Sequence, residues 1–329
     1  MTYVPSVTVA IVNYNTREAL RNCLSSLRRV LNEVNMTIIV VDNASSDGSL
    51  AMLESEFHDL TVLANRENVG FARAINQAFV SCTSDFFLML NPDTWVAKNA
   101  VVRLVEMAER DPKIGVVGAQ LTSFRGDTLQ SVLARPNLAK EFLNLFPELK
   151  AVLLPPFIKQ ILLRSRERRR GEIIEVPAVS GGAMLVRSVA YKDAGGLDER
   201  FFVYHEEVDF CLRVQKLGWK VVIAPDAQVL HLEALSTGFK VNRLPSEPVL
   251  GWRLTGLAIL FEKHGSRRQS ARFVRMAQIL LKVRALLCSL RAWWGGEMRE
   301  NWKRRSQELE LAAVRLSKLT KHSESGLIS

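Results

Sequence analysis

The segment FFLMLNPDT contains a carboxylate in a position where it could bind a metal ion. Residues 86–90 are apolar and predict a buried strand, which would end at Asn91, Pro92 and Asp93. Carboxylate oxygens are ligands that Mg²⁺ and Mn²⁺ prefer. His231, in the apolar segment AQVLHL, could bind the same ion, although a histidine within a strand is more often a structural residue.

A second set of carboxylates, Glu206, Glu207 and Asp209, follows the aromatic segment FFVY. The segment EEVDFCLRVQKLG predicts a helix over 206–218, and acidic residues stabilise the first turn of any helix. Asp209 could also pair with Arg213 one turn later. One of these carboxylates could instead act as a general base, if burial or a neighbouring acid raised its pKa.

The elements that must position these residues alternate between strand and helix from residue 7 to about residue 121. Apolar runs predict strands, and apolar residues three or four apart predict helices. This alternation is typical of an α/β fold with a mostly parallel, Rossmann-like sheet and helices on both faces. The expected strands are 7–14, 37–42, 60–65 and 86–90, followed later by 220–225 and 227–232, and the expected helices are 17–31, 47–57, 70–81 and 98–110.

Polar residues follow each of the first four strands, in the segments NYN, DNASSDGS, NRENVGFARAIN and NPD. Asn and Asp are common in turns, but polar residues at four successive strand ends favour a binding site there. Neither a GxGxxG turn nor a P-loop is present, which argues against a nicotinamide cofactor. Phosphate groups would then have to be held in another way, for which a metal ion with oxygen ligands is the usual alternative.

The net charge of +10 is concentrated in two segments. Residues 150–175 carry seven Lys/Arg against three Glu, and residues 267–305 carry eleven Lys/Arg against two Glu. Such segments attract the phosphate groups of nucleic acids, anionic lipids or phosphorylated substrates. The four cysteines are far apart and predict reduced thiols in a cytosolic protein. We expect no signal peptide, and no uncharged apolar run is long enough to span a bilayer.

Seven motifs in order, VAIVNYN, VVDNASSDGS, NVGFARAIN, LNPDT, SGGAMLVR, FFVYHEEVDFCLR and VLH, resemble those of the inverting family 2 glycosyltransferases. The chain looks most like the rhamnosyltransferase branch, which builds bacterial cell-surface polysaccharides. The resemblance covers roughly residues 6–240. It implies the GT-A fold and Mn²⁺ or Mg²⁺ as cofactor. It also implies transfer of a sugar from a dTDP- or UDP-sugar, dTDP-rhamnose as first choice, to a glycan or a lipid-diphosphate-linked glycan.

The resemblance also implies roles for individual residues. Asp42 would bind the pyrimidine base, and Asp93 and His231 would hold the metal ion. Glu207 occupies the position of the catalytic base, with Glu206 as the alternative, and Asp209 belongs to the same motif. The other residues expected at the donor nucleotide are Asn13, Asn15, Asn43, Asn68, Gly70, Phe71, Asn76 and Asn91, and those expected at the acceptor or sugar are Gly181, Gly182 and Arg213.

We expect a catalytic domain over residues 1–248, with an insertion at about 137–172, and a basic amphipathic helical region over 249–329. In that region one helical stripe combines Phe273, Met276, Leu280, Val283, Leu287, Leu290 and Trp294. The stripe could pack on the catalytic domain or in a homodimer. It could also lie on an anionic membrane, with Trp293 and Trp294 at the headgroups, which would place the protein at the cytoplasmic face of the cell membrane.

Two other functions compete with this interpretation. A nucleic-acid-binding protein could use the basic C-terminal region on phosphates, but the carboxylates at the strand ends would repel a polyanion, so we expect no nucleic acid partner. A catalytically inactive relative that binds sugar nucleotides would share every motif, and only turnover of a donor separates it from an enzyme.

Overall fold

The computed structural model describes residues 5–145, 173–232, 247–294 and 298–324, and these fold as two compact units. The sheet unit contains the described residues of Met1–Arg135 and Ile173–Thr237. The helical unit contains those of Pro136–Glu172 and Gly238–Ser329. Most of the predicted insertion, with the basic run RSRERRRG, lies outside the described residues. Its described helix, α5 (Leu138–Leu145), packs in the helical unit, whereas we had predicted the insertion within the catalytic domain.

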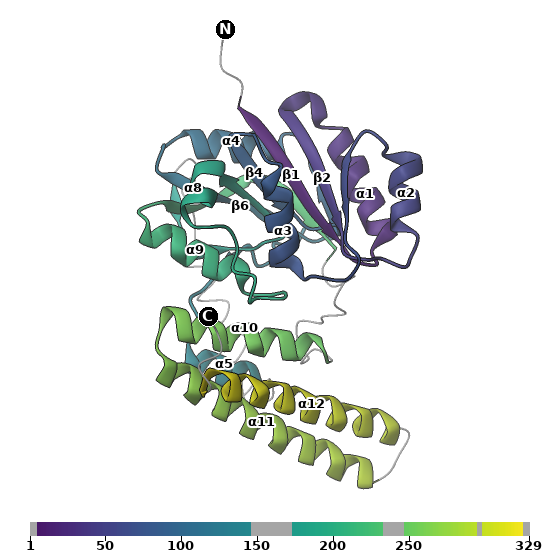
Figure 1. Cartoon of the computed structure of the whole chain (residues 1–329), viewed down its shortest axis with the longest axis vertical. Helices are drawn as coiled ribbons and strands as arrows, with labels where there is room; N and C mark the ends of the chain where they lie inside the picture. The colour runs from purple at the N-terminus through teal and green to yellow at the C-terminus, as the bar shows by residue number, and fades with distance from the viewer. Residues whose placement is uncertain (1–4, 146–172, 233–246, 295–297, 325–329) are drawn as a thin grey trace. The chain divides into compact units, whose positions relative to one another are not determined.

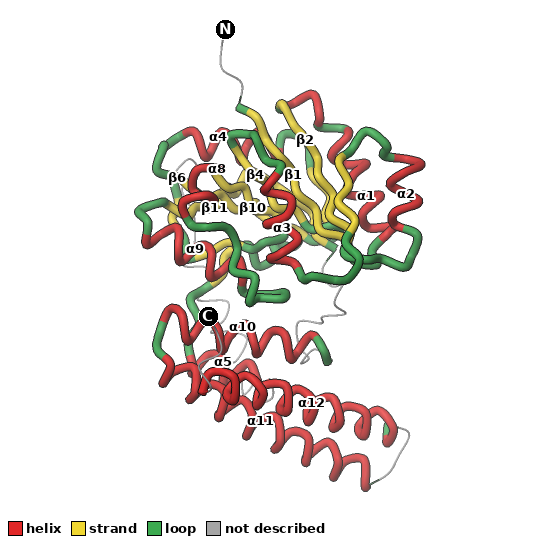
Figure 2. The backbone as a smooth tube through the Cα atoms, viewed as in Figure 1, coloured by secondary structure: helices red, strands yellow, loops and turns green. Residues whose placement is uncertain are grey.

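The sheet unit is built on one sheet with the strand order β3-β2-β1-β4-β10-β6-β11-β5, in which β8 also pairs with β11 (Figures 1 and 2). The pairs among β1, β2, β3 and β4 are parallel, as is β6 with β11. The middle strand β10 is antiparallel to both neighbours, so the expected α/β sheet is mixed. The strands are β1 (Ser6–Asn13), β2 (Asn35–Asp42), β3 (Thr61–Ala64), β4 (Phe86–Leu90), β5 (Thr94–Val96), β6 (Ile114–Thr122), β8 (Ile174–Glu175), β10 (Ala183–Arg187) and β11 (Lys220–His231).

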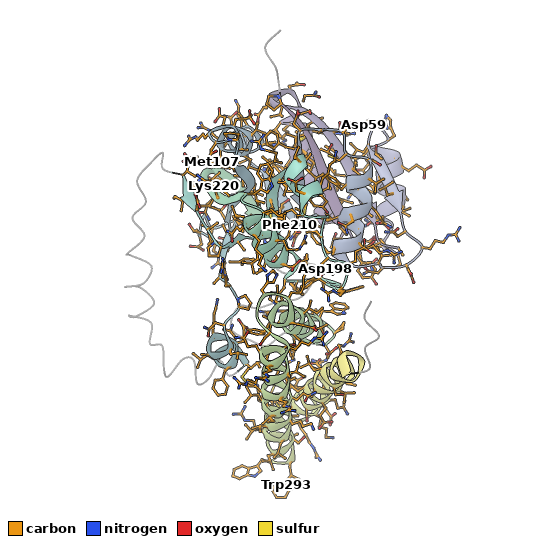
Figure 3. The ribbon with its side chains drawn as sticks, turned by 60° about the vertical axis from the view of Figure 1, so that its left-hand side comes forward. Asp59, Met107, Asp198, Phe210, Lys220 and Trp293 are labelled. Carbon is orange, nitrogen blue, oxygen red and sulfur yellow. The ribbon has the colours of Figure 1, made fainter. Side chains whose placement is uncertain are left out.

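Helices cover both faces of this sheet, as expected for strands with apolar side chains on both faces. On one face α1 (Arg17–Arg28), α2 (Ser49–Glu56) and α4 (Ala100–Glu109) share a core with alternate residues of the strands. On the other face α3 (Phe71–Val80), α8 (Ser188–Asp193) and α9 (Glu206–Lys216) pack around an aromatic cluster. That cluster contains Phe79, Phe87, Tyr191 and Phe210, the last of which is labelled in Figure 3. A short helix η1 (Leu31–Glu33) and the strand pair β7 (Val132–Leu133) and β9 (Ala178–Val179) complete the unit.

The predicted strands 220–225 and 227–232 are one strand, β11, with an irregularity between Ala224 and Gln228. Pro225 lies at this irregularity, which is where a residue without an N–H can be accommodated within a sheet. The second half of β11 turns to pair with β5, so that His231 stands opposite Thr94. This pairing decides the position of His231 in the candidate site.

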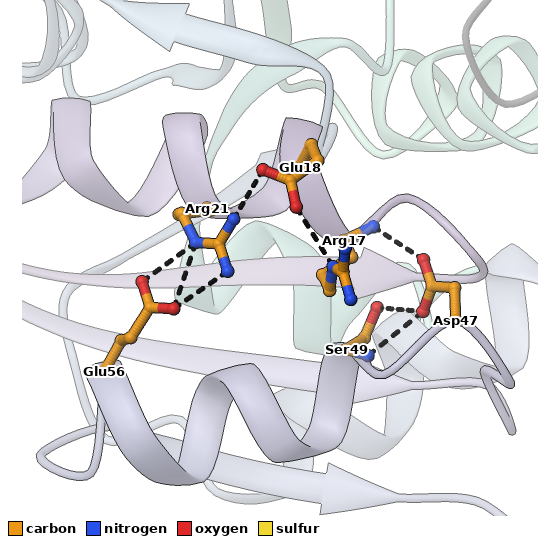
Figure 4. Close-up of polar contacts among 6 residues, drawn as sticks. All are labelled: Arg17, Glu18, Arg21, Asp47, Ser49 and Glu56. Carbon is orange, nitrogen blue, oxygen red and sulfur yellow. Dashed lines mark hydrogen bonds and ion pairs between the residues drawn. The ribbon is translucent and has the colours of Figure 1, made fainter.

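Helices α1 and α2 are joined at the surface by charged side chains (Figure 4). The guanidinium of Arg21 donates to Glu18 on its own helix and to Glu56 of α2, at 2.5 Å and 2.8 Å. Asp47 accepts from the backbone N–H of Arg17 at 2.8 Å and caps the turn before α2. Exposed ion pairs contribute little stability, so these contacts mainly fix the direction of the loop before α2.

The helical unit consists of α5, α10 (Val249–His264), α11 (Arg267–Trp293) and α12 (Arg299–Glu324). Ser266 caps α11 through a hydrogen bond from the N–H of Gln269. The helices share a core of their own, with Phe261 and Phe273 in ring contact 5.1 Å apart. Among the described residues, no helix is long and apolar enough to cross a membrane.

The buried face of α11 differs from the apolar stripe that we predicted. Phe273 is buried, and Met276 and Leu280 are partly buried, but Val283, Leu287, Leu290 and Trp294 are exposed. The buried face turns instead toward smaller side chains, which allow neighbouring helices to approach closely. Its members are Phe273, Val274, Ala277, Leu281, Ala285, Cys288 and Ala292.

Candidate active site

The carboxyl ends of the parallel strands bring the predicted polar residues to one edge of the sheet. Asn13 of β1 stands opposite Asp42 of β2, and Asp42 stands opposite Ala64 of β3. The next strand, β4, ends at Leu90, opposite Ala183 of β10. Antiparallel β10 therefore begins at the edge where β4 ends, and this brings the loop before β10 to the same place.

The turn after β4 is held by backbone and hydroxyl hydrogen bonds. The N–H of Asn91 donates to the carbonyl of Gly182 at 3.0 Å, and Thr94 Oγ1 donates to the carbonyl of Asn91 at 2.7 Å. The N–H of Leu232 donates to the carbonyl of Asp93 at 2.9 Å, which ties the turn to the end of β11. Asp93 is thereby fixed in a buried position, although nothing in its immediate sequence determines that burial.

The Asp93 carboxylate faces His231. Oδ1 of Asp93 lies 3.2 Å from Nε2 of His231 and accepts no hydrogen bond from any described residue. The Asn91 side-chain Nδ2 lies 3.2 Å from the same Nε2, and an amide nitrogen can only donate. With the imidazole proton on Nδ1, both Nε2 of His231 and Oδ1 of Asp93 have a lone pair with which to bind a cation. This arrangement fits a divalent cation bound by both atoms.

Asp42 and Asn13 form a buried polar pair at the ends of β1 and β2. Asn13 Nδ2 donates to Oδ2 of Asp42 at 2.7 Å, and its Oδ1 accepts from Thr16 Oγ1 at 2.6 Å. Oδ1 of Asp42 accepts from the N–H of Ser45 at 2.9 Å. Ser45 Oγ in turn accepts from Asn13 Nδ2 and from the N–H of Asn15, which is in the left-handed region. The pair is rigid because each member is hydrogen-bonded within the loop cluster.

The loop before α3 is connected to the same cluster. Asn43 Nδ2 donates to Oδ1 of Asn68 and to the carbonyl of Gly70, at 3.2 Å and 3.1 Å. Gly70 has φ +84° and ψ 173°, a conformation that essentially only glycine adopts. A Cβ atom at Gly70 would lie 2.5 Å from the carbonyl oxygen of Phe202, to which the N–H of Phe71 donates at 2.7 Å. The absence of a side chain therefore allows the segment before α9 to dock on this loop.

Two predicted ligand-binding residues, Asn76 and Arg213, make hydrogen bonds to the segment between α8 and α9. Asn76 Oδ1 accepts from Tyr191 Oη at 2.6 Å and from the N–H of Leu197 at 2.9 Å. Arg213 pairs with the fully buried Asp209 at 2.8 Å and donates to the carbonyls of Ala194 and Gly196. These contacts hold the segment that leads into α9.

Helix α9 begins with the acidic residues. Tyr204 and His205, just before it, both have positive φ values of 73° and 74°. Consecutive non-glycine residues in this region cost on the order of 1–3 kcal/mol each, and such strain is concentrated at functional sites. Glu206 is buried, and Oε2 of its carboxyl accepts no hydrogen bond from a described residue. Burial raises the pKa of Glu206 well above its ordinary value, and the neighbouring Glu207 raises it further.

Glu207 lies beside the loop before β10. A Cβ atom built on Gly181 would be 3.7 Å from Cβ of Glu207, in ordinary van der Waals contact, so this glycine lies directly beside the Glu207 side chain. The next residue, Gly182, accepts the hydrogen bond from the N–H of Asn91. The loop before β10 therefore contacts both the turn after β4, which contains Asp93, and helix α9.

Three residues with clear roles in this arrangement were missed by the sequence-based prediction. Ser45 connects Asn13, Asn15 and Asp42, Thr94 holds the turn after β4, and the carbonyl of Phe202 receives the loop before α3. Ser45 could have been found, because a serine three residues after an Asp is a common turn partner. The role of a backbone carbonyl leaves no trace in the sequence.

Comparison with protein families matches residues 8–193 to the model described as Glycosyl transferase family 2. The chain belongs to glycosyl transferase family 2. This family 2 glycosyltransferase is 29% identical over 243 residues to the N-acetylglucosaminyl-diphospho-decaprenol L-rhamnosyltransferase of Mycobacterium tuberculosis, an alignment that covers 70% of this chain and 77% of that protein.

Solved structures similar to this glycosyltransferase include a mannosyltransferase from Pyrobaculum calidifontis in complex with GDP-Man and Mn²⁺. That likeness has a TM-score of 0.55 at 18% identity and covers 96% of this chain and 88% of the other. A second is GalNAc-T7 with UDP, GalNAc and Mn²⁺, with a TM-score of 0.58 at 15% identity, covering 94% and 55% of the two chains. The predicted GT-A fold is thereby confirmed.

Proposed function

We propose that this glycosyltransferase moves L-rhamnose from dTDP-rhamnose to a hydroxyl of a lipid-diphosphate-linked glycan, with inversion at the anomeric carbon. The mycobacterial relative, named for rhamnosyl transfer to a lipid-linked N-acetylglucosamine, supports both the donor and the acceptor. The observation in the structure that supports the proposal most is the buried Asp93 carboxylate facing His231 at the carboxyl end of β4.

The nucleotide of the donor would bind at the loops after β1, β2 and β3. Asp42 would accept a hydrogen bond from the pyrimidine base, and Asn13 holds its carboxylate in place at 2.7 Å. Asn15, Asn43, Asn68, Gly70 and Phe71 would line the same pocket, because they form the connected loops beside Asp42. Asn76 and Arg213 would act indirectly, since both are hydrogen-bonded to the segment that positions α9.

Asp93 and His231 would bind Mn²⁺ or Mg²⁺ together with oxygen atoms of the donor diphosphate. Among the described residues no group of three or more His, Cys, Asp or Glu could hold a metal ion, so the donor would have to complete the ligand shell. When bound, such an ion offsets the negative charge on the leaving nucleoside diphosphate. Asn91 would lie beside the ion, since its Nδ2 is 3.2 Å from Nε2 of His231.

Glu207 would take the proton from the acceptor hydroxyl. The position of Glu207 in the acidic motif supports this assignment, and Glu206, whose pKa is raised by burial and by Glu207, is the alternative base. The acceptor oxygen then attacks the anomeric carbon opposite the diphosphate, so configuration inverts without a covalent enzyme intermediate. Gly181 and Gly182 would line the acceptor site, because Gly181 lies directly beside the Glu207 side chain.

Incubation with a panel of dTDP- and UDP-sugars, Mn²⁺ and a polyprenyl-diphosphate-linked N-acetylglucosamine tests this function, with detection of the nucleotide released. We expect the fastest release from dTDP-rhamnose. Faster release from another nucleotide sugar would change the donor assignment. Binding of donors without any release would identify the protein as an inactive relative.

We also propose that the reaction serves bacterial cell-surface polysaccharide synthesis at the cytoplasmic face of the cell membrane. A lipid-linked acceptor is held in the bilayer, so the enzyme would have to reach it at the membrane surface. The basic charge of the helical unit suits such a surface.

A further inference from the structure

Helix α11 carries a second apolar face, opposite the one that packs in the helical unit. It is formed by Ile279, Val283, Leu286, Leu290, Trp293 and Trp294, which we call the α11 outer face. These residues recur at the three- and four-residue spacing of one helix face. Trp293 and Trp294 are 78% and 86% exposed, and Figure 3 shows Trp293 extending outward at the end of α11. Contiguous exposed apolar surface of this kind marks an interaction site.

The charges on α11 indicate what could cover this face. Between Arg267 and Trp293 the helix has seven Lys/Arg and no Asp or Glu. Arg268, Arg272, Arg275 and Lys282 are exposed along the same side of the helix as the α11 outer face. A partner must therefore offer apolar volume and negative charge together.

A second copy of the chain does not meet that requirement. Two copies paired through the α11 outer face would bring their basic residues together, without any acidic residue on α11 to compensate them. A nucleic acid would supply negative charge but would leave the two tryptophans in water. An anionic bilayer supplies both, because acyl chains accept apolar side chains and phosphate headgroups attract Lys and Arg.

We propose that the α11 outer face is a docking surface for anionic bilayers. Its aliphatic residues enter the acyl boundary, Trp293 and Trp294 lie at headgroup level, and the basic residues contact lipid phosphates. The inference deepens the proposed function, since it names the surface with which the enzyme would meet a lipid-linked acceptor. It differs from the predicted stripe in that Phe273, Met276 and Leu280 take no part, because they pack inside the helical unit.

Flotation of the full-length protein with vesicles tests the proposal in the absence of donor and acceptor, so the result is independent of any transfer activity. The vesicles contain equal amounts of phosphatidylglycerol and phosphatidylcholine, or phosphatidylcholine alone. We expect binding to the anionic vesicles at about 0.1 M salt, and binding at least tenfold weaker at about 1 M salt or on phosphatidylcholine alone. A wild-type protein that stays in solution at the lower salt would overturn the proposal.

Two double variants test whether vesicle binding requires the α11 outer face or only exposed apolar side chains in general. Leu286→Gln with Leu290→Gln changes two residues of the face that are 60% and 50% exposed. Leu311→Gln with Val314→Gln changes two equally exposed residues of α12, which are 60% and 53% exposed. We expect at least tenfold weaker vesicle binding for the α11 variant and unchanged binding for the α12 variant. Equal losses in the two variants would contradict a specific face.

Sedimentation of the same proteins without lipid tests the alternative that a second copy of the chain covers the α11 outer face. A monomeric wild type is the expected result. A wild-type dimer that the Leu286→Gln, Leu290→Gln variant converts to a monomer would assign the face to a second copy and overturn the membrane proposal. Circular dichroism of each variant shows whether its helices are retained, since exposed substitutions should leave the fold intact.

Discussion

Oδ1 of Asp93 lies 3.2 Å from Nε2 of His231, and Nδ2 of Asn91 lies 3.2 Å from the same Nε2. Asp93 lies in the turn between β4 and β5 and His231 at the end of β11, and they meet only because β5 pairs with the end of β11. With the imidazole proton on Nδ1, the carboxylate oxygen and the ring nitrogen are both of the kind that binds a divalent ion. The relationship therefore makes this pair the candidate metal site of the sheet edge.

We expect Asp93→Asn to abolish the Mn²⁺-dependent part of dTDP binding while the fold and its thermal stability are retained. The amide has the size of the carboxylate but lacks the negative charge that binds the ion. Calorimetric titration with dTDP, with and without Mn²⁺, measures the first effect, and thermal unfolding measures the second. Asp59→Asn, at an exposed carboxylate, is the matched control. Unchanged metal dependence in the Asp93 variant would remove this residue from the metal site.

Glu207→Gln should lower sugar transfer by about a hundredfold or more and leave donor affinity unchanged, as expected for loss of a general base. Single-turnover transfer and donor titration separate these two quantities. The exposed Glu106→Gln on α4 controls for the change of charge. If Glu206→Gln abolishes transfer while Glu207→Gln does not, the base is Glu206 instead.

Glu206 should make stability fall as pH rises. Its pKa is higher in the folded protein because of burial, so above about pH 4.5 the unfolded chain loses this proton while the folded chain keeps it. The folded state then binds more protons, and the free energy of unfolding decreases by at most about 1.4 kcal/mol per pH unit until the folded pKa is reached. Glu206→Gln carries no titrating proton, so urea unfolding between pH 5 and pH 7 should show a smaller decrease for this variant. Parallel curves for the two proteins would show that Glu206 does not titrate in this range.

Gly70→Ala should destabilise the protein more than Gly126→Ala. Both glycines have positive φ, +84° and +79°, but a Cβ at Gly70 would lie 2.5 Å from the Phe202 carbonyl oxygen, whereas a Cβ at Gly126 meets nothing within 4 Å. The additional cost of overpacking is about 1–3 kcal/mol. Urea unfolding of the two variants measures the difference. Equal destabilisation would show that the segment at Phe202 moves aside at little cost.

The sequence by itself determined the first four strands, β1 to β4, and most of the residues at their ends, whereas β5, β6 and β10 were not predicted. Residues 37–42 and 86–90 form strands because runs of β-branched or large apolar side chains are stable only in a buried sheet. Parallel strands then place the residues that follow them at one edge, which is why Asp42 and Asn13 could be predicted to lie together. In each case the residue types within the segment were sufficient for the prediction.

Pairing between distant segments was decided only by the tertiary structure. Antiparallel β10 inserts between β4 and β6, and β11 continues past Pro225 to pair with β5. Both pairings give backbone hydrogen-bond partners to strand edges that would otherwise be unpaired, and the local sequence does not show which distant segment will provide them. That second pairing positions His231, so its approach to Asp93 could not be derived from spacing. Asn76 and Arg213 likewise contact backbone groups of the segment between α8 and α9, and only the folded chain brings these groups near.

Helix α11 shows most clearly what the sequence determines and what only the tertiary structure decides. Its apolar spacing predicted a helix, and 267–293 is helical. Apolar residues surround much of the helix, however, so the sequence did not determine which face would be buried. The neighbouring helices decided it: they pack where Ala277, Ala285 and Ala292 permit close approach, and they leave the larger Leu290 and Trp294 in contact with solvent.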